Sequence, residues 1–356
     1  VPVEYGGYSL SVSHQLDIVT EIAKSCGSTA WIVWVGSSTS WIPVRFGQRL
    51  DSGRDASPEP LLVALGPRLP GLHLLRPGDR PLELRLALVL HLLEQHLEGA
   101  GEVATDAENL VVKSIAFTFA KFGQKLPRLH LKAHNIIPHG RGMGSSGAAV
   151  VSGIVAAKGL LQGIVEISDN QLLDIATEIE GHPDNVAPAL FGGLTIAWHD
   201  QTGPRHKKLF VHRGVAPLVL VPSFKMSTAL ARSLQPDSVP HDDAVFNVSR
   251  SALLIAALTQ SPELLIDATE DRLHQNYRAA AMPETDALIQ LLRQNGLAAV
   301  VSGAGPSVLV LANGPAERAD AVKLVGEHYP NWMPLLLAVD FKGATVVMHQ
   351  GSDATI

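Results

Sequence analysis

One glycine- and serine-rich stretch has the composition of a loop that binds an anion. It runs Pro138-His139-Gly140-Arg141-Gly142-Met143-Gly144-Ser145-Ser146-Gly147-Ala148-Ala149. Three glycines within five residues allow positive φ angles and a close approach of the backbone to a ligand. A helix should follow, and the amides at its start would attract phosphate. The stretch is neither a Walker loop nor a dinucleotide fingerprint, because the Gly-Lys-Ser/Thr and the later acidic residue are missing. The alternative is a glycine-rich turn without a ligand.

A second stretch, Glu178-Ile179-Glu180-Gly181-His182-Pro183-Asp184-Asn185-Val186-Ala187-Pro188, supplies carboxylates. A carboxylate beside a phosphate loop can hold Mg²⁺ while nucleotide phosphates supply other ligands. Glu178 and Glu180 lie two positions apart on a predicted helix, so only one should face the loop. Asp184 and Asn185 would serve substrate or magnesium, and the alternative for Asp184 is an N-cap of a helix over 186–190.

A third stretch, Ser302-Gly303-Ala304-Gly305-Pro306-Ser307, lies between two apolar runs. A tight turn there would expose backbone amides, and the alternative is a plain hairpin turn.

The elements that must position these stretches form a mixed pattern. Apolar periodicity predicts helices over 110–122, 150–161, 171–180, 242–259, 262–275, 284–294 and 316–328, and strands over 129–133, 194–198, 218–221, 297–301, 308–311 and 334–340. Such mixed strands and long helices predict an α+β fold rather than a doubly wound sheet.

Composition limits the function classes. The 356 residues carry a net charge of −6 and no long basic block, which argues against nucleic acid as the main partner. Cys26 is the single cysteine, which excludes a disulfide framework and a multi-cysteine metal site. The longest apolar run, 86–93, is far short of the roughly 20 residues of a membrane span. We expect a cytoplasmic protein with no signal peptide and no membrane association.

The three stretches, in this order and at these separations, resemble the GHMP kinase superfamily and more closely its homoserine kinases of the actinobacterial type. Supporting segments are 109–111, 227–232, 241–250 and 271–278, and the resemblance covers about residues 101–350. It implies an N-terminal ATP-binding domain over 101–212, like domain 2 of ribosomal protein S5. It also implies a ferredoxin-like C-terminal domain over 213–350.

The resemblance also implies roles for individual residues. The loop from Pro138 to Ser146 would wrap the phosphates of ATP, with Asn109 near the nucleotide. Ser146 and Glu178 would hold Mg²⁺, with Ser145 and Glu180 as the alternatives. The acceptor side would comprise Asp184, Asn185, Thr228, Arg232, Arg278, Gly303 and Gly305. Glu178, Asp184 and Arg232 would be catalytic, and Asp184 is the candidate base. The arginines suit a substrate carboxylate, since a guanidinium matches it bidentately.

The implied reaction is the ATP-dependent phosphorylation of the L-homoserine hydroxyl in threonine biosynthesis, by an enzyme that would form a homodimer. Three alternatives remain: a relic that binds nucleotide weakly, a kinase of another small alcohol, and a flavin-dependent oxidoreductase. A metal hydrolase built on His130, His134 and His139 is disfavoured, because a strand does not cluster these residues on one helical face.

The first hundred residues depart from the resemblance. Residues 3–46 look like a helical fragment of an acyl-CoA-dehydrogenase-type flavin monooxygenase, which makes 1–50 a foreign fragment. Residues 51–100 are rich in Pro, Arg and Leu and look like a frameshifted segment. Homoserine kinases open with a strand and a Ser-Ala-Asn-Leu-Gly-Pro-Gly-Phe-Asp segment, of which only Ala64-Leu65-Gly66-Pro67 has a trace here. Without that strand, we expect an open edge on the sheet.

Overall fold

The computed structural model describes residues 101, 103–127, 129–226 and 228–346, together with short strands at 14–15, 31–37, 40–45 and 349–350. For those short strands, and for residues 130, 132, 134, 228, 229 and 232, it describes the backbone alone. The segment 51–100 and, apart from those short strands, the fragment 1–50 lie outside the described residues.

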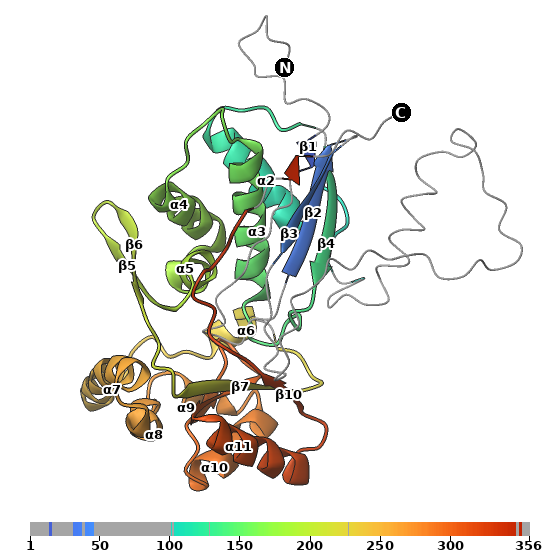
Figure 1. Cartoon of the computed structure of the whole chain (residues 1–356). Coiled ribbons are helices and arrows are strands. Elements are labelled where there is room, and N and C mark those ends of the chain that lie inside the picture. Colours follow the sequence, from blue (N-terminus) through green and yellow to red (C-terminus); the bar gives the residue numbers. More distant parts are fainter. Residues whose placement is uncertain are drawn as a thin grey trace, which may run out of the picture.

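Four helices form a layer that carries the first two motifs (Figure 1). They are α2 (Leu110–Lys121), α3 (Ser145–Leu160), α4 (Asp169–Glu180) and α5 (Pro183–Phe191). Helix α3 is the central one, because most of its residues are buried. It packs closely on α2 at Gly153, where a Cβ would come within 2.5 Å of the Ser114 side chain. The α3 sequence is therefore small and apolar on all sides, as a fully enclosed helix requires.

A three-stranded antiparallel sheet, in the order β3-β2-β4, lies beside this layer. Strand β4 (His130–Asn135) pairs with β2 (Trp31–Ser37), which pairs with β3 (Ser40–Arg45). The short strands β1 (His14–Gln15) and β11 (His349–Gln350) pair with each other. Two sequence expectations are therefore wrong: residues 31–37 and 40–45 form strands rather than a helical fragment, and one edge of β4 is paired rather than open. The β-branched and aromatic residues of β2 explain its strand conformation.

A second sheet forms the other half of the molecule. It comprises β7 (Val215–Val221), β8 (Ala299–Val301), β9 (Val308–Asn313) and β10 (Met333–Leu336), antiparallel in the order β10-β7-β9-β8. Along the chain, helix α10 (Pro283–Gln294) lies between β7 and β8, and helix α11 (Pro315–His328) lies between β9 and β10. The succession βαββαβ with this order is the ferredoxin-like arrangement that the resemblance implies. The α+β class is confirmed.

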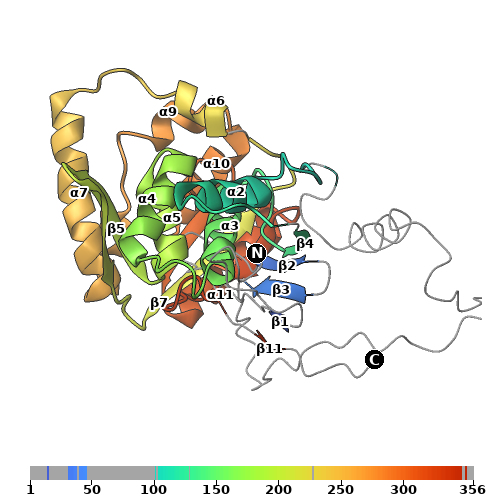
Figure 2. The same ribbon diagram turned by 90° about the horizontal axis from the view of Figure 1, so that it is seen from above.

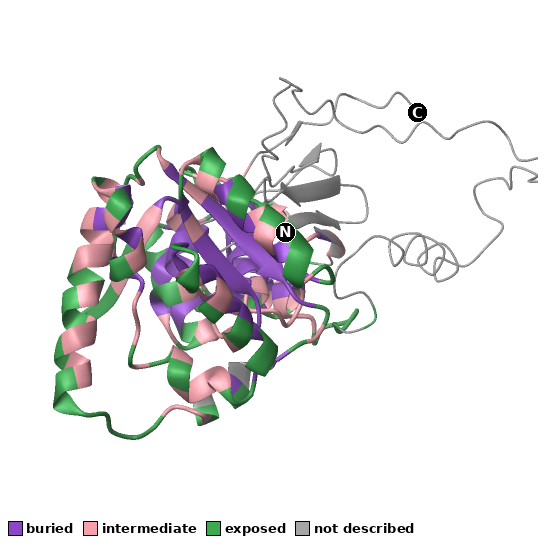
Figure 3. Ribbon diagram, turned by 90° about the horizontal axis from the view of Figure 1, so that it is seen from below, coloured by how far each residue is buried: buried purple, intermediate pink, exposed green. Residues whose placement is uncertain are grey.

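Strand β7 serves two hydrophobic cores, because successive side chains of a strand point to opposite faces. Leu218 and Leu220 pack with residues of α10 and α11. Val219 and Val221 pack with the core of the N-terminal helical layer. The buried strands of this sheet consequently run through the middle of the molecule (Figure 3).

The chain between β7 and α10 forms a helical insertion. It contains α6 (Thr228–Ser233), α7 (His241–Thr259), the 3-10 turn η2 (Pro262–Leu264), α8 (Leu265–Ala268) and α9 (Gln275–Ala279). Helix α7 lies at the outer side of the molecule in both views (Figures 1 and 2). Only Ala257 and Leu258, near its C-terminal end, are buried.

Several predicted boundaries are wrong. Helix α3 begins at Ser145, five residues before the predicted start, and β5 (Leu194–Asp200) pairs with an unpredicted strand, β6 (Gly203–Leu209). The single helix predicted over 262–275 is instead η2, α8 and a turn that ends where α9 begins. The carboxylate of Asp271 accepts from the backbone N–H groups of Leu273, His274 and Gln275. A side chain that binds these donors competes with helical hydrogen bonding and breaks the helix.

Candidate active site

The glycine-rich stretch forms the tight loop that its composition predicts. Gly140, Gly142 and Gly144 have φ angles of 68°, 72° and 74°, which favour glycine. Gly144 directly precedes α3, whose first two residues are Ser145 and Ser146. The loop therefore delivers the chain to the N-terminus of a buried 16-residue helix. Backbone N–H groups and the helix dipole at that end can bind phosphate.

The glycine loop is seated directly on the third motif, although about 160 residues separate them. The Ser302 hydroxyl donates to the Gly142 carbonyl over 2.9 Å. A Cβ on Gly142 would come within 2.6 Å of the Gly305 carbonyl oxygen, and a Cβ on Gly303 within 2.9 Å of the Gly142 oxygen. We call this contact between 140–144 and 302–305 the loop interlock. It joins the two halves of the molecule where the first and third motifs meet.

Arg141 fixes the loop rather than facing outward as a phosphate ligand would. Its Nε donates to the Pro222 carbonyl over 2.9 Å, and its Nη2 donates to the Ser223 carbonyl over 3.2 Å. The Gly140 carbonyl accepts from the Met226 N–H over 3.2 Å. These bonds attach the loop to the chain that leaves β7. Met143 is buried, so the loop also has an apolar attachment to the core.

The structure separates the two candidate magnesium carboxylates. The Ser146 hydroxyl donates to Glu180 Oε1 over 2.9 Å. The Glu178 carboxylate instead pairs with Lys121 Nζ on α2 at 2.6 Å. In this structure Glu180, the alternative ligand of the sequence analysis, is the carboxylate that contacts Ser146, and Glu178 contacts Lys121. The two residues point to different sides of α4, as their spacing predicts.

Ser146 and Glu180 fit a magnesium ion by their chemistry. A hydroxyl and a carboxylate are oxygen ligands of the kind Mg²⁺ uses, and it takes remaining ligands from phosphates and water. Ser146 is on the first turn of α3, beside the glycine loop where phosphates would lie. Glu180 is also the last residue of α4, so two helix ends meet at this point.

A cleft of about 680 Å³ adjoins the loop interlock and contains most of the predicted acceptor residues. Asp184 and Asn185 contribute from the start of α5, Arg278 from α9, and Gly303 from the interlock. Asn185 lies against α3, since a Cβ on Gly147 would be 3.3 Å from the Asn185 Cβ. The structure thus brings residues from both halves to one cavity beside the phosphate loop. Gly305 is in the interlock but does not line the cleft.

Asp184 and Arg278 both have protein partners in the cleft. The Asp184 carboxylate, 72% exposed, contacts Nδ1 of His182. Arg278 Nη1 donates to the Gly303 carbonyl over 3.3 Å. Asp184 caps nothing through its side chain, because the N-cap of α5 is His182 and proline occupies the first helical position. The arrangement offers a carboxylate and a guanidinium to a small polar substrate.

Five further predicted residues are placed as follows. Asn109 is the N-cap of α2, where its side chain accepts from the Val111 N–H over 2.9 Å and donates to the Ala104 carbonyl over 2.7 Å. Thr228 and Arg232 belong to α6, where only the backbone is described. The backbone of α6 is held near the interlock, since Ala231 packs with Met226 and Met282 and against Ala304. Pro138 and His139 precede the first glycine of the loop.

The sequence analysis used 271–278 as a supporting segment of the resemblance but assigned no function to 269–275, of which several residues line the cleft. The carboxylate of Asp271 binds several groups of this segment. Burial raises the pKa of Asp271, but hydrogen bonds from His274, the Gln275 N–H, Asn247 and the Leu273 N–H lower it by more. The net result is a pKa well below the usual range. The sequence signal that could have indicated a turn here was Asp271, three residues before His274, within a stretch that otherwise has a helical pattern.

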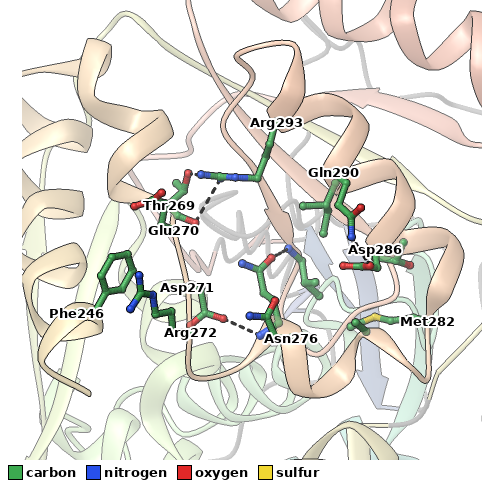
Figure 4. Close-up of a pocket in the computed structure, with 15 residues that line it drawn as sticks. Phe246, Thr269, Glu270, Asp271, Arg272, Asn276, Met282, Asp286, Gln290 and Arg293 are labelled. Carbon is green, nitrogen blue, oxygen red and sulfur yellow. Dashed lines mark hydrogen bonds between the residues drawn. The ribbon is translucent and has the colours of Figure 1, made fainter. Parts of the chain in front are cut away.

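A second hollow, of about 320 Å³, adjoins the cleft, and residues of the 269–275 segment line both (Figure 4). There Arg293 donates to the Thr269 hydroxyl over 2.9 Å and to the Ile266 carbonyl over 2.6 Å. Its guanidinium thereby secures the chain that enters the segment. Within the described residues, no three His, Cys, Asp or Glu side chains form a metal-binding group, and no helix has the length and apolarity to cross a membrane.

Comparisons with known proteins agree with this geometry. The model of the GHMP kinases N terminal domain matches residues 109–193, and that of the GHMP kinases C terminal domain matches 252–331. A homoserine kinase of Clavibacter michiganensis subsp. michiganensis is 71% identical over 256 residues, which are 71% of this chain and 81% of that protein. One of Streptomyces coelicolor is 47% identical over 70% of this chain and 80% of its own length.

A solved structure gives the same result. The crystal structure of homoserine kinase from Cytophaga hutchinsonii superposes with a TM-score of 0.63 at 25% identity, and the match covers 70% of this chain and 82% of that one. The glycine loop, the interlock and the cleft all lie in the portion with this architecture. The chain therefore belongs to the homoserine kinase family of the GHMP kinases.

Proposed function

We propose that this protein is a homoserine kinase that transfers the γ-phosphoryl group of ATP to the hydroxyl of L-homoserine. The hydroxyl oxygen forms a bond to the γ-phosphorus, the bond from that phosphorus to the ADP oxygen breaks, and the hydroxyl proton leaves. The products are O-phospho-L-homoserine and ADP. This reaction belongs to threonine biosynthesis.

The observation that carries this proposal is the loop interlock. The interlock puts the glycine loop and the N-terminus of α3 against the cleft that contains Asp184, Asn185 and Arg278. A donor phosphate on the loop and an acceptor in the cleft would consequently be neighbours. Phosphoryl transfer depends chiefly on such positioning and on charge neutralisation.

The chain's own groups have distinct tasks in this proposal. The amides of the 140–144 loop bind the phosphates, while Arg141 holds the loop in shape. Ser146 and Glu180 would hold Mg²⁺, which supplies charge neutralisation at the transferred phosphoryl group when bound. Arg278, with Arg232 and Thr228 on α6, binds the substrate carboxylate. Asp184, oriented by His182, is the candidate acceptor of the hydroxyl proton.

The first hundred residues limit the activity that we expect. The Asn and Asp of the usual opening segment would hydrogen-bond homoserine, and losing two such contacts costs on the order of 2–5 kcal/mol. We therefore propose weaker binding of Mg-ATP than in an intact homoserine kinase and slow phosphorylation of homoserine. The competing proposal, a relic that only binds nucleotide, rests on the same missing opening segment.

A coupled ADP-release assay with L-homoserine decides between them. The matched chimera carries a normal opening strand and substrate segment in place of residues 1–100, and it should turn over much faster than the original chain. Full activity in the original chain would show that residues 1–100 supply the missing ligands. Absence of homoserine-dependent ADP release from both proteins would overturn the proposed function. A second acceptor series of small alcohols without a carboxylate tests the alternative of another small-alcohol kinase.

The sequence of the coding DNA tests the origin of residues 51–100. A shifted frame that spells the missing Asn-Leu-Gly-Pro-Gly-Phe-Asp segment would support a frameshift, and its absence from every frame would overturn it. A flavin-monooxygenase origin of residues 3–46, a homodimer and a cytoplasmic location remain predictions.

A further inference from the structure

The cleft contains a histidine that the proposed function does not use. His274 precedes α9 and lines the cleft together with Arg278, one helical turn further along. Its side chain is 57% exposed. Its Nδ1 lies 3.3 Å from Oδ1 of Asp271, whose own side chain is only 13% exposed. An exposed ring supported by a nearly buried carboxylate is arranged to present its other nitrogen to a ligand.

Asp271 is a rigid support for this ring because the surrounding chain saturates its carboxylate. It accepts from the N–H groups of His274 at 3.0 Å and of Gln275 at 2.6 Å. It also accepts from the Asn247 side-chain amide at 2.8 Å. Gln275 in turn accepts from the Val301 N–H over 2.8 Å, which attaches the start of α9 to the strand that leads into the interlock.

Helix α7 holds the same support from outside through three residues on one face, Asp243, Asn247 and Arg250. Asp243 and Arg250 each contact one member of the triplet 270–272, and Asn247 contacts two. Arg250 pairs with Glu270 at 2.8 Å, and Arg272 pairs with Asp243 at 3.3 Å. Asn247 accepts from the Arg272 N–H over 2.8 Å while it donates to Asp271.

We call this face and its triplet the α7 latch. Phe246 of α7 adds a stacking surface, since the Arg272 guanidinium lies 3.8 Å from its ring centroid (Figure 4). The latch fixes the turn that carries His274.

The contact with Asp271 determines which ring nitrogen carries the proton. A carboxylate only accepts, so Nδ1 of His274 is the donor, and in the neutral ring Nε2 is an acceptor. Within the described part of the chain, Nε2 has no hydrogen-bond partner. Arg278, four positions later, offers only donors. The two side chains therefore present an acceptor and a donor to the same cleft.

That pair matches the charged head of an amino acid, in which an ammonium donor and a carboxylate acceptor share one carbon. We propose that His274, positioned by Asp271, accepts a hydrogen bond from the α-ammonium group of the acceptor substrate while Arg278 binds its carboxylate. His274 is then a specificity-determining residue, and Asp271 is a positioning residue that acts through it. This inference rests on the proposed function for the identity of the acceptor.

The test measures direct binding of homoserine to the full chain by calorimetry. His274→Phe keeps a ring but removes both nitrogens, and it should weaken homoserine binding about 10- to 100-fold, the loss expected for a hydrogen bond to a charged group. His274→Gln, which places an amide near the Nε2 position, should restore most of the affinity. ATP affinity should stay unchanged in both. His328→Phe, at the exposed end of α11, is the matched control and should change neither affinity.

Two substrate analogues separate ammonium recognition from general damage. 4-Hydroxybutanoate lacks the amino group, so His274→Phe should bind it as well as the unsubstituted chain does. 3-Amino-1-propanol lacks the carboxylate, and its binding should fall with His274→Phe by the same factor as that of homoserine. An equal loss for 4-hydroxybutanoate would overturn the assignment of His274 to the ammonium group.

Asp271→Asn tests the positioning step. An asparagine amide can donate to Nδ1 and so move the ring proton to Nε2, which then repels an ammonium group. As a single substitution, Asp271→Asn should weaken homoserine binding. Combined with His274→Phe, it should cause no further loss of affinity, because both substitutions act through one contact. Additive losses would overturn the positioning role. Homoserine binding without ADP release in either the full chain or the chimera would refute the proposed function and leave this inference standing. Homoserine binding unchanged by His274→Phe would refute this inference and leave the proposed function standing.

Discussion

Replacement of Glu180 by glutamine should abolish most phosphoryl transfer and slightly stabilise the protein. The carboxylate lies 2.9 Å from the Ser146 hydroxyl, where it would hold Mg²⁺ against the phosphates. The loss of such an electrostatic contribution to the transition state lowers kcat/KM by about 10²–10³. Glu180 is also the last residue of α4, and a negative charge opposes the helix dipole there. Its removal should therefore raise the free energy of unfolding by about 0.3–1 kcal/mol.

Glu178→Gln is the matched control, on the same helix two positions away. It breaks the Glu178–Lys121 ion pair, whose partners are 51% and 43% exposed. A pair this exposed contributes at most about 1 kcal/mol, and it stands apart from Ser146. Glu178→Gln should consequently leave kcat/KM near that of the unsubstituted chain.

The assay is homoserine-dependent ADP release over a magnesium titration, on the chimera with the normal opening segment. Glu180→Gln should need much more Mg²⁺ for half-maximal rate, while thermal unfolding shows an unchanged or higher Tm. The reverse outcome, with activity lost in Glu178→Gln and kept in Glu180→Gln, would refute the argument and restore Glu178 as the metal ligand.

Three further predictions concern the loop, the support of the cleft and the acceptor side. Gly142→Ala should lower ATP affinity and destabilise the fold by about 1–3 kcal/mol in chemical denaturation, because its φ is 72° and a Cβ would lie 2.3 Å from the Ser302 carbonyl oxygen. The lowered pKa of Asp271 contributes stability above its unfolded pKa of about 4. That stability is lost as the pH falls toward the folded-state pKa, so urea titrations should show a smaller acid-induced loss in Asp271→Asn. Arg232→Leu should raise the KM for homoserine about 10- to 100-fold and leave the KM for ATP unchanged, and a change for ATP alone would contradict its assignment.

The sequence predicted the features that depend on local chemistry. Glycine adopts positive φ without strain, so the cluster of Gly140, Gly142 and Gly144 could be recognised as a tight loop without knowledge of its partners. The α+β class followed from periodicity, and Asp184, Asn185 and Arg278 could be assigned to one site by resemblance. These three residues do line one cleft.

The sequence could not predict features that depend on distant contacts. Glu178 and Glu180 differ in their contacts, with Lys121 and with Ser146 respectively, whereas their spacing shows only that they face different sides. The helix predicted over 262–275 fails because Asp271 has a partner on α7, Asn247, that no local pattern reveals. The interlock between Gly142 and Ser302 likewise arises only in the folded chain.

The two-faced strand β7 has a consequence for folding. Its alternate residues complete the core of α10 and α11 on one side and the core of the N-terminal helices on the other. Neither half could be expressed alone without exposing one row of β7 side chains or losing it. The halves should therefore unfold in a single cooperative transition, with no intermediate in which the phosphate loop survives on its own. A destabilising change in either half would then lower the free energy of unfolding of the catalytic centre as well.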